Sequence, residues 1–282
     1  MTTNISLEEA QQALKGVTIP PRPALLSEIS AELQKANPDT KMLASRIAKD
    51  VGLSSSILKV VNSPYFGLRS KIGSVTNAVQ LLGISNVKNI VTGLMLKTAL
   101  NKNAVSLERF WDSAEKVARI SAHIASTLPK APCDEAYTFG LFRDCGIPLL
   151  MQRFSDYKET LKIASGMDRA LTAVEDERHG TNHAVVGYMV ARVWGLPDAI
   201  PEALLRHHDP TVLVRSDGAS SMARTLVAIN FLAEYLNDAV LRLRDNAEWS
   251  NIGEAALAHL GMASADLVEL KDEVESYSED QT

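Results

Sequence analysis

Apolar residues recur at helical spacing along most of the chain. In residues 24–33, Leu25, Leu26 and Ile29 fall on one face of a helix. No segment shows convincing alternation of apolar and polar residues over four or more positions, as a half-buried strand would. The pattern therefore predicts an all-α fold. The same spacing predicts further helices over 40–51, 53–61, 74–82, 86–100, 106–126, 134–144, 148–153, 155–164, 171–178, 183–194, 197–208 and 224–236.

Polar turns divide these predicted helices into groups. A short first helix opens with a capping box and ends at Gly16. The polar stretch 101–103 separates two apolar helices and is the best candidate for a junction between two packed subdomains. The expected division is an N-terminal helix at 1–18, a helical subdomain at 19–100, a second subdomain at 104–210 and a C-terminal helical extension at 211–282 that completes the second subdomain.

Composition and charge narrow the possible partners. The chain has 282 residues, of which 46% are apolar and 22% charged, as in an ordinary globular protein. A net charge of −5 argues against nucleic acid or an anionic membrane as the main partner. The N-terminus lacks the basic and apolar regions of a secretory signal, and the two cysteines form no disulfide framework. We therefore expect a reduced, cytoplasmic protein with no membrane span.

The most unusual stretch of the sequence is 140–150, which is apolar on both sides of one charged pair, Arg143 and Asp144. Burying such a pair is costly unless the charges pair with other groups or bind a ligand. One interpretation is that both side chains reach solvent at a helix end. The other is that a polar pocket lies here, and the rest of the sequence favours the pocket.

Several short motifs occur in order between residues 19 and 210. They are IPP at 19–21, KD at 49–50, SILKVVNSPYFG at 56–67, LLGI at 81–84, FW at 110–111, GLFRD at 140–144, HAVVG at 183–187, WGLP at 194–197 and HHDP at 207–210. In this combination the chain resembles the bacterial HDOD domain, a relative of the HD-type metal-dependent phosphohydrolases. The resemblance implies an all-helical fold with an HD-like second half and a role in signal transduction.

The same resemblance assigns the metal-ligand positions of those enzymes to residues of this chain. HD-type phosphohydrolases use an early His, a His-Asp pair and a later Asp to hold metal ions that activate water. These positions fall on Ser113, on Arg143 and Asp144, and loosely on Glu234. A serine hydroxyl is a poor ligand, and arginine has only N–H donors and a fixed positive charge. We therefore expect a degenerate site without metal or other cofactor, in which Arg143 pairs with Asp144 or, better, Glu234.

Three histidines of the second half are further candidates. His183, His207 and His208 could gather near the pocket, and three imidazoles can bind zinc. Roles in capping or packing are favoured, because a histidine is more often a satisfied polar group than a ligand. The expected vestigial pocket consists of Ser113, Arg143, Asp144, His183, His207, His208 and Glu234.

These observations favour a non-catalytic signalling or regulatory protein that acts through binding. A protein partner in signalling is expected. A further interpretation is that the pocket binds an anionic small ligand through Arg143. The alternative is a metal-dependent phosphohydrolase acting on a nucleotide or another phosphate ester. Ser113 and Arg143 count against the enzyme, and the sequence holds no glycine-rich phosphate loop or Walker motif.

Overall fold

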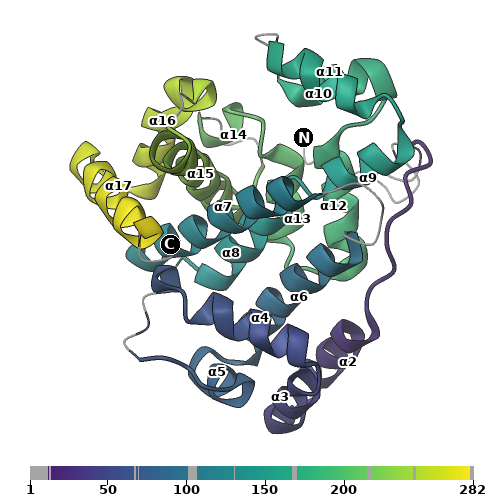
Figure 1. Cartoon of the computed structure of the whole chain (residues 1–282), viewed down its shortest axis with the longest axis vertical. Helices are drawn as coiled ribbons and strands as arrows, with labels where there is room; N and C mark the ends of the chain where they lie inside the picture. The colour runs from purple at the N-terminus through teal and green to yellow at the C-terminus, as the bar shows by residue number, and fades with distance from the viewer. Residues whose placement is uncertain are drawn as a thin grey trace.

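The computed structural model describes residues 12, 14–66, 68, 70–100, 107–129, 131–166, 170–214, 218–243 and 246–279. Throughout this part of the chain every regular element is a helix, which confirms the all-α prediction (Figure 1). Most of the helix expected at 1–18, and the whole junction at 101–103, lie outside the described residues. No described helix is long and apolar enough to cross a membrane.

The helices of the first hundred residues lie together at one end of the molecule, at the bottom of Figure 1. Asp39, Asp50 and Ser74 each cap the helix that follows, because the side-chain oxygen accepts a backbone N–H three residues on. The elements are α2 (Ala24–Leu33), α3 (Thr40–Ala48), α4 (Val51–Val61), a 3₁₀ helix (Pro64–Phe66), α5 (Val75–Leu82) and α6 (Ile84–Leu100).

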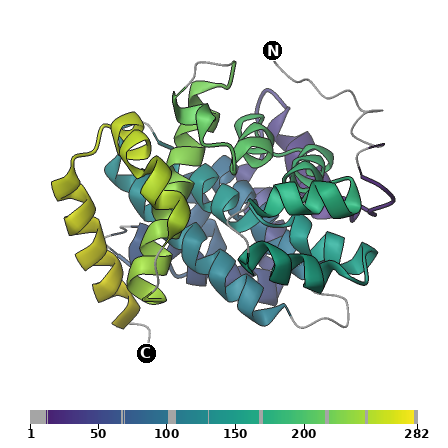
Figure 2. The same ribbon diagram turned by 90° about the horizontal axis from the view of Figure 1, so that it is seen from above.

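The remaining helices surround two that cross the middle of the molecule, α7 and α8. The C-terminal helices lie along one side, and α10 and α11 lie on the other (Figures 1 and 2). The elements are α7 (Glu108–Thr127), α8 (Cys133–Phe142), α9 (Gly146–Arg153), α10 (Tyr157–Gly166), α11 (Leu171–His179), α12 (His183–Trp194), α13 (Ala199–Arg206), α14 (Thr211–Val214), α15 (Ser221–Leu236), a π-helix (Asn237–Leu241), α16 (Ala247–Leu260) and α17 (Ser264–Glu279).

Helix α8 is the centre of the packing. It contacts α6 from the first half of the chain, α7 and α13 from the second, and α15 from the C-terminal segment. Gly140 permits the close approach of α7, since a Cβ at this position would lie 2.8 Å from the Cα of Ala118. One hydrophobic core therefore runs through both halves of the chain.

The predicted helix at 134–144 needs one correction. Helix α8 ends at Phe142, so Arg143 and Asp144 lie in the turn before α9 and not within a helix. The carboxylate of Asp134, in the first turn of α8, accepts a hydrogen bond from Asn89 Nδ2 on α6 at 2.6 Å. The turn matters for the site, because it frees Asp144 to point in the same direction as Arg143.

The start of α9 touches the start of α12 at Gly146. A Cβ on Gly146 would lie 2.2 Å from the backbone carbonyl oxygen of His183. Because that separation is far below van der Waals contact, only glycine allows the two helix ends to meet here. This contact holds His183 beside the Arg143–Asp144 turn.

We predict that Gly146→Ala lowers the free energy of unfolding by about 2 kcal/mol, because the added methyl forces two backbone segments apart. Urea denaturation followed by circular dichroism measures the change. Gly73→Ala is the matched control, since a Cβ there meets nothing within 4 Å, and we expect a change within about 0.5 kcal/mol. Equal effects of the two substitutions would contradict the close-contact explanation.

Candidate functional site

The turn between α8 and α9 holds a buried arginine with three partners. Arg143 is 5% exposed. Its Nε donates to Glu234 Oε1 at 2.6 Å, its Nη1 donates to the Gly140 carbonyl at 2.7 Å, and its Nη2 lies 3.2 Å from Asp144 Oδ2. The predicted pairing with Glu234 is confirmed, and Asp144 joins it because a turn lets neighbouring side chains converge.

The charged groups around Arg143 change one another's pKa values. Burial opposes the charge on Arg143, but Asp144 and Glu234 outweigh burial and raise the pKa of the guanidinium. Burial raises the pKa of Glu234 above its usual range, although Arg143 opposes the shift. Burial would also raise the pKa of Asp144, yet Arg143 and the nearby histidines hold it well below its usual range. Arg143 is therefore a fixed cation that faces two carboxylates, those of Glu234 and Asp144.

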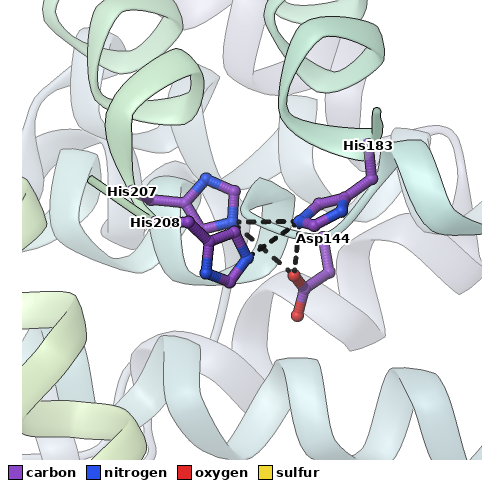
Figure 3. A group of neighbouring side chains, drawn as sticks. All are labelled: Asp144, His183, His207 and His208. Carbon is purple, nitrogen blue, oxygen red and sulfur yellow. Dashed lines mark hydrogen bonds and ion pairs between the residues drawn. The ribbon is translucent and has the colours of Figure 1, made fainter. Parts of the chain in front are cut away.

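Three histidines converge on Asp144 (Figure 3). His183 begins α12, which Asn182 caps, while His207 and His208 follow the last turn of α13. His183 Nε2 lies 2.9 Å from His208 Nε2 and 3.4 Å from His207 Nε2. Asp144 Oδ1 lies 3.7 Å from both His183 Nε2 and His207 Nε2. One nitrogen or oxygen from each of the four residues falls within 4.8 Å of the others.

A buried carboxylate orients His183. Glu175 on α11 has no exposed surface, and its Oε2 lies 2.7 Å from His183 Nδ1. The same oxygen accepts the backbone N–H of His183 at 3.0 Å, and Oε1 accepts the hydroxyl of Tyr157 on α10. Since the carboxylate receives donors on both oxygens, it fixes the direction of the His183 ring.

The other two histidines are held at their outer nitrogens as well. His207 Nδ1 donates to the Leu204 carbonyl at 2.7 Å, and His208 Nδ1 lies 3.3 Å from Glu248 Oε1 on α16. Burial and the neighbouring His208 lower the pKa of His207 to about 4. Burial would lower the pKa of His208 too, but Glu248 raises it. All three Nε2 atoms therefore face the same point between the rings.

A cavity of about 460 Å³ opens beside this group. Its lining contains four carboxylates and two guanidinium groups, so the walls carry a net negative charge when His208 is neutral. The π-helix Asn237–Leu241 contributes two of the lining side chains, and π-helical turns are frequent at functional sites. The polar lining consists of Ser113, Arg143, Asp144, His208, Glu234, Asn237, Asp238, Arg242, Asn246 and Glu248.

The structure brings the seven predicted site residues into one region. Five of them line the cavity, while His183 and His207 lie buried against Asp144 and His208. That the site is degenerate stays a prediction. The sequence reasoning missed Glu175, Asp238 and Glu248. Asp238 follows Glu234 by four residues, a helical spacing that was available as a signal, whereas Glu175 lies in the charged run 175–178, which is typical of a surface helix.

A sequence model of the HDOD domain matches residues 19–210. The chain belongs to the HDOD family. It is 26% identical over 209 residues to an uncharacterized protein of Treponema pallidum, covering 68% of this chain and 38% of that protein. It is also 36% identical over 75 residues to the uncharacterized protein YuxH of Bacillus subtilis, covering 27% of this chain and 18% of that protein. The alignments therefore cover less than half of the length of either curated relative.

Solved structures of similar proteins agree with the HDOD fold. A provisionally named phosphohydrolase from Shewanella amazonensis has a TM-score of 0.69 at 18% identity, covering 96% of this chain and 93% of that one. An HDOD domain protein of unknown function from Geobacter sulfurreducens has a TM-score of 0.64 at 20% identity, covering 95% of this chain and 96% of that one. A provisionally named signal transduction protein from Marinobacter aquaeolei has a TM-score of 0.65 at 21% identity, covering 95% of this chain and 61% of that one.

We predict that Arg143→Met lowers the free energy of unfolding by about 3 kcal/mol, because it leaves buried carboxylates without their cation. Chemical denaturation at neutral pH measures the change. Arg46→Met is the matched control: Arg46 pairs with Glu28 on the surface, where both side chains are about half exposed, and the substitution should leave stability nearly unchanged. A similar small effect at Arg143 would mean that its ion pairs contribute nothing to the fold.

Proposed function

We propose that this HDOD protein is a non-catalytic regulator that acts in bacterial signal transduction by binding. The observation that carries the proposal is the buried Arg143, whose guanidinium is engaged by Glu234, Asp144 and the Gly140 carbonyl. By the resemblance to HD-type phosphohydrolases, Arg143 occupies a position where those enzymes have a histidine ligand. A fixed cation there cannot coordinate a metal and repels one.

The charge of the cavity supports a binding role over phosphoester hydrolysis. A phosphate group entering the cavity would meet the carboxylates of Asp144, Glu234, Asp238 and Glu248. An anionic ligand near Arg143 would have to compete with the carboxylates that already hold its Nε and Nη2. We therefore favour a cationic ligand in the cavity, and a protein partner as the recipient of the signal.

A metal-dependent phosphohydrolase is the second candidate function. The group of three histidines around Asp144 supports it, because imidazole and carboxylate are common metal ligands in hydrolases. Against it, two-metal sites place their ions roughly 4 Å apart, and Arg143 Nη2 lies 3.2 Å from Asp144 Oδ2, next to the position a second ion would need. A phosphohydrolase that uses a single metal ion is not excluded by this distance, and an activity assay distinguishes it from a non-catalytic protein.

We predict no phosphatase or phosphodiesterase turnover by the full chain. The assay supplies Mg²⁺, Mn²⁺, Fe²⁺ or Zn²⁺ in turn, with p-nitrophenyl phosphate, its bis-ester, nucleoside phosphates and cyclic mononucleotides and dinucleotides as substrates. Asp144→Asn is the matched control for contaminating hydrolases, and both proteins should give the same background. Turnover by the wild type that Asp144→Asn abolishes would overturn the non-catalytic proposal.

A further inference from the structure

We propose that α17 is a displaceable, autoinhibitory helix that occupies the docking surface for an amphipathic helix of a protein partner. This surface, the α17-binding surface, is formed by Tyr65 of the 3₁₀ helix and His123 of α7. Helix α17 lies at the outer edge of the molecule (Figures 1 and 2), and the HDOD match ends at residue 210, well before it. The inference rests on the proposed function only in taking a protein as the partner.

A narrow apolar stripe attaches α17 to the rest of the molecule. Leu270 and Val274 are buried in the core, with 3% and 0% of their surface exposed, and Tyr277 is partly buried against it. These three positions have the i, i+4, i+7 spacing with which an amphipathic helix binds a groove. The opposite face is open to solvent, where Val268 is 59% exposed. A helix held through one such stripe opens at a lower free energy than a helix packed on all sides.

Three aromatic rings meet where the last turn of α17 reaches the two halves of the chain. The ring of Tyr277 packs edge-on against Tyr65 and against His123, with centroid distances of 5.1 and 5.2 Å. Tyr65 and His123 also contact each other, at 6.0 Å. Tyr65 comes from the first half of the chain and His123 from the second. Aromatic residues are enriched at interfaces between proteins, so this contact has the composition of such an interface.

The polar part of the contact is incompletely satisfied. His123 is 6% exposed, and its Nε2 lies 2.6 Å from Glu273 Oε2 on α17. The other ring nitrogen, Nδ1, is buried and has no hydrogen-bond partner among the described residues. Leaving a buried polar atom unpaired costs free energy, and native cores hold few such atoms. The closed position of α17 is therefore less stable than its apolar contacts alone would make it.

The first turns of α17 do not close tightly against the molecule. A hollow of about 360 Å³ lies between them, the end of α7 and the turn before α17. Protein cores are packed as densely as organic crystals and hold few spaces larger than a water molecule. A hollow of this size at the contact is typical of a loosely held helix. Its lining consists of Thr127, Leu128, Pro129, Leu260, Gly261, Met262, Asp266, Glu269, Leu270 and Glu273.

Displacement of α17 would also affect the charged cavity. Helix α17 packs against the π-helix, whose Asn237 and Asp238 line that cavity. On α15, the ring of Tyr235 lies beneath Lys271 of α17, with Nζ 4.8 Å from the ring centroid, and Tyr235 is next in sequence to the cavity residue Glu234. A partner that replaces α17 therefore removes support from two elements of the cavity wall. Such a shared element is what couples a ligand site to a partner site.

The face that α17 buries defines the chemistry of the partner. The matching helix carries aliphatic residues at i and i+4, an aromatic residue at i+7 and a carboxylate at i+3, as Leu270, Val274, Tyr277 and Glu273 do. The carboxylate meets His123, and the aromatic ring meets Tyr65 and His123. A peptide with the sequence of residues 264–279 contains all four groups and serves as the probe.

The first experiment measures amide hydrogen exchange of the full chain by mass spectrometry at several low concentrations of denaturant. Amides of α17 should exchange at least about 10-fold faster than those of the central helix α8, through a local opening that depends little on denaturant. Exchange of α17 and α8 in one step, with the same dependence on denaturant, would overturn the proposal. In that case α17 would open only when the whole chain unfolds.

Two substitutions on the same helix make a matched pair. Val274→Asp places a charge at the buried anchor and should speed exchange of α17 amides by at least about 100-fold, while α8 keeps its protection. Val268→Asp makes the same change on the exposed face and should exchange as the wild type does. Tyr277→Ala is a milder variant that removes only the ring contacts, and we expect exchange about 3- to 10-fold faster. Equal effects of the two aspartates would contradict the proposal.

Docking is tested with a fluorescent peptide of residues 264–279 and the full chain. The peptide should bind the Val274→Asp protein, whose surface is open, at least about 100-fold more tightly than the wild type, where the tethered α17 competes at a high effective concentration. A peptide carrying Val268→Asp should bind equally well, and one carrying Val274→Asp should not bind. Failure of the native peptide to bind the Val274→Asp and Tyr277→Ala proteins would overturn the proposal. So would a wild-type dimer that exchanges α17 between chains, because the occupant would then be a second copy.

The failure of this proposal and the failure of the proposed function are distinguishable. A permanently packed α17 would overturn the displaceable helix and leave the non-catalytic regulator standing. Phosphoester turnover that Asp144→Asn abolishes would overturn the regulator and leave the displaceable helix standing, since exchange of α17 amides does not depend on hydrolysis.

Discussion

A buried guanidinium needs anions, and supplying them to Arg143 organises much of this molecule. Its partners come from different parts of the chain: Asp144 from the same turn, the Gly140 carbonyl from α8, and Glu234 from α15, some 90 residues later. Removing either side of such a buried pair leaves an uncompensated charge. Ion pairing therefore holds α15 against the turn between α8 and α9, in addition to the packing of the apolar face of α15.

Asp144 links this ion-pair network to the histidines. Its Oδ2 faces Arg143 while its Oδ1 faces His183 and His207, so one carboxylate serves both groups. A charged carboxylate at this position is favoured by Arg143 whatever the histidines do. The consequence is a pocket that keeps its negative potential, in which the histidines are oriented from outside by Glu175 and Glu248. The outer nitrogens of two of the three histidines are therefore held by carboxylates from neighbouring helices.

Much of the architecture could be predicted because helix formation is local. Apolar spacing predicted α2, α6 and α12 to within two residues at each end, since hydrogen bonds in a helix join residues four apart. The limit of α8 was misjudged, because the apolar run continues through the turn and offers no polar signal at Phe142. The pairing of Arg143 with Glu234 was predicted from the resemblance to HD-type phosphohydrolases, which places both residues at ligand positions, together with the need of a buried charge for a partner.

The sequence by itself determined the helical class, the order of the helices, the family resemblance and the residue types available for chemistry. Only the tertiary structure decided that three imidazoles and one carboxylate meet with one nitrogen or oxygen atom of each within 4.8 Å of the others. That meeting depends on Gly146 against His183 and on Glu175 and Glu248 behind the rings, contacts between helices rather than within them. Local sequence patterns carry no information on such contacts, because they arise from how whole helices pack.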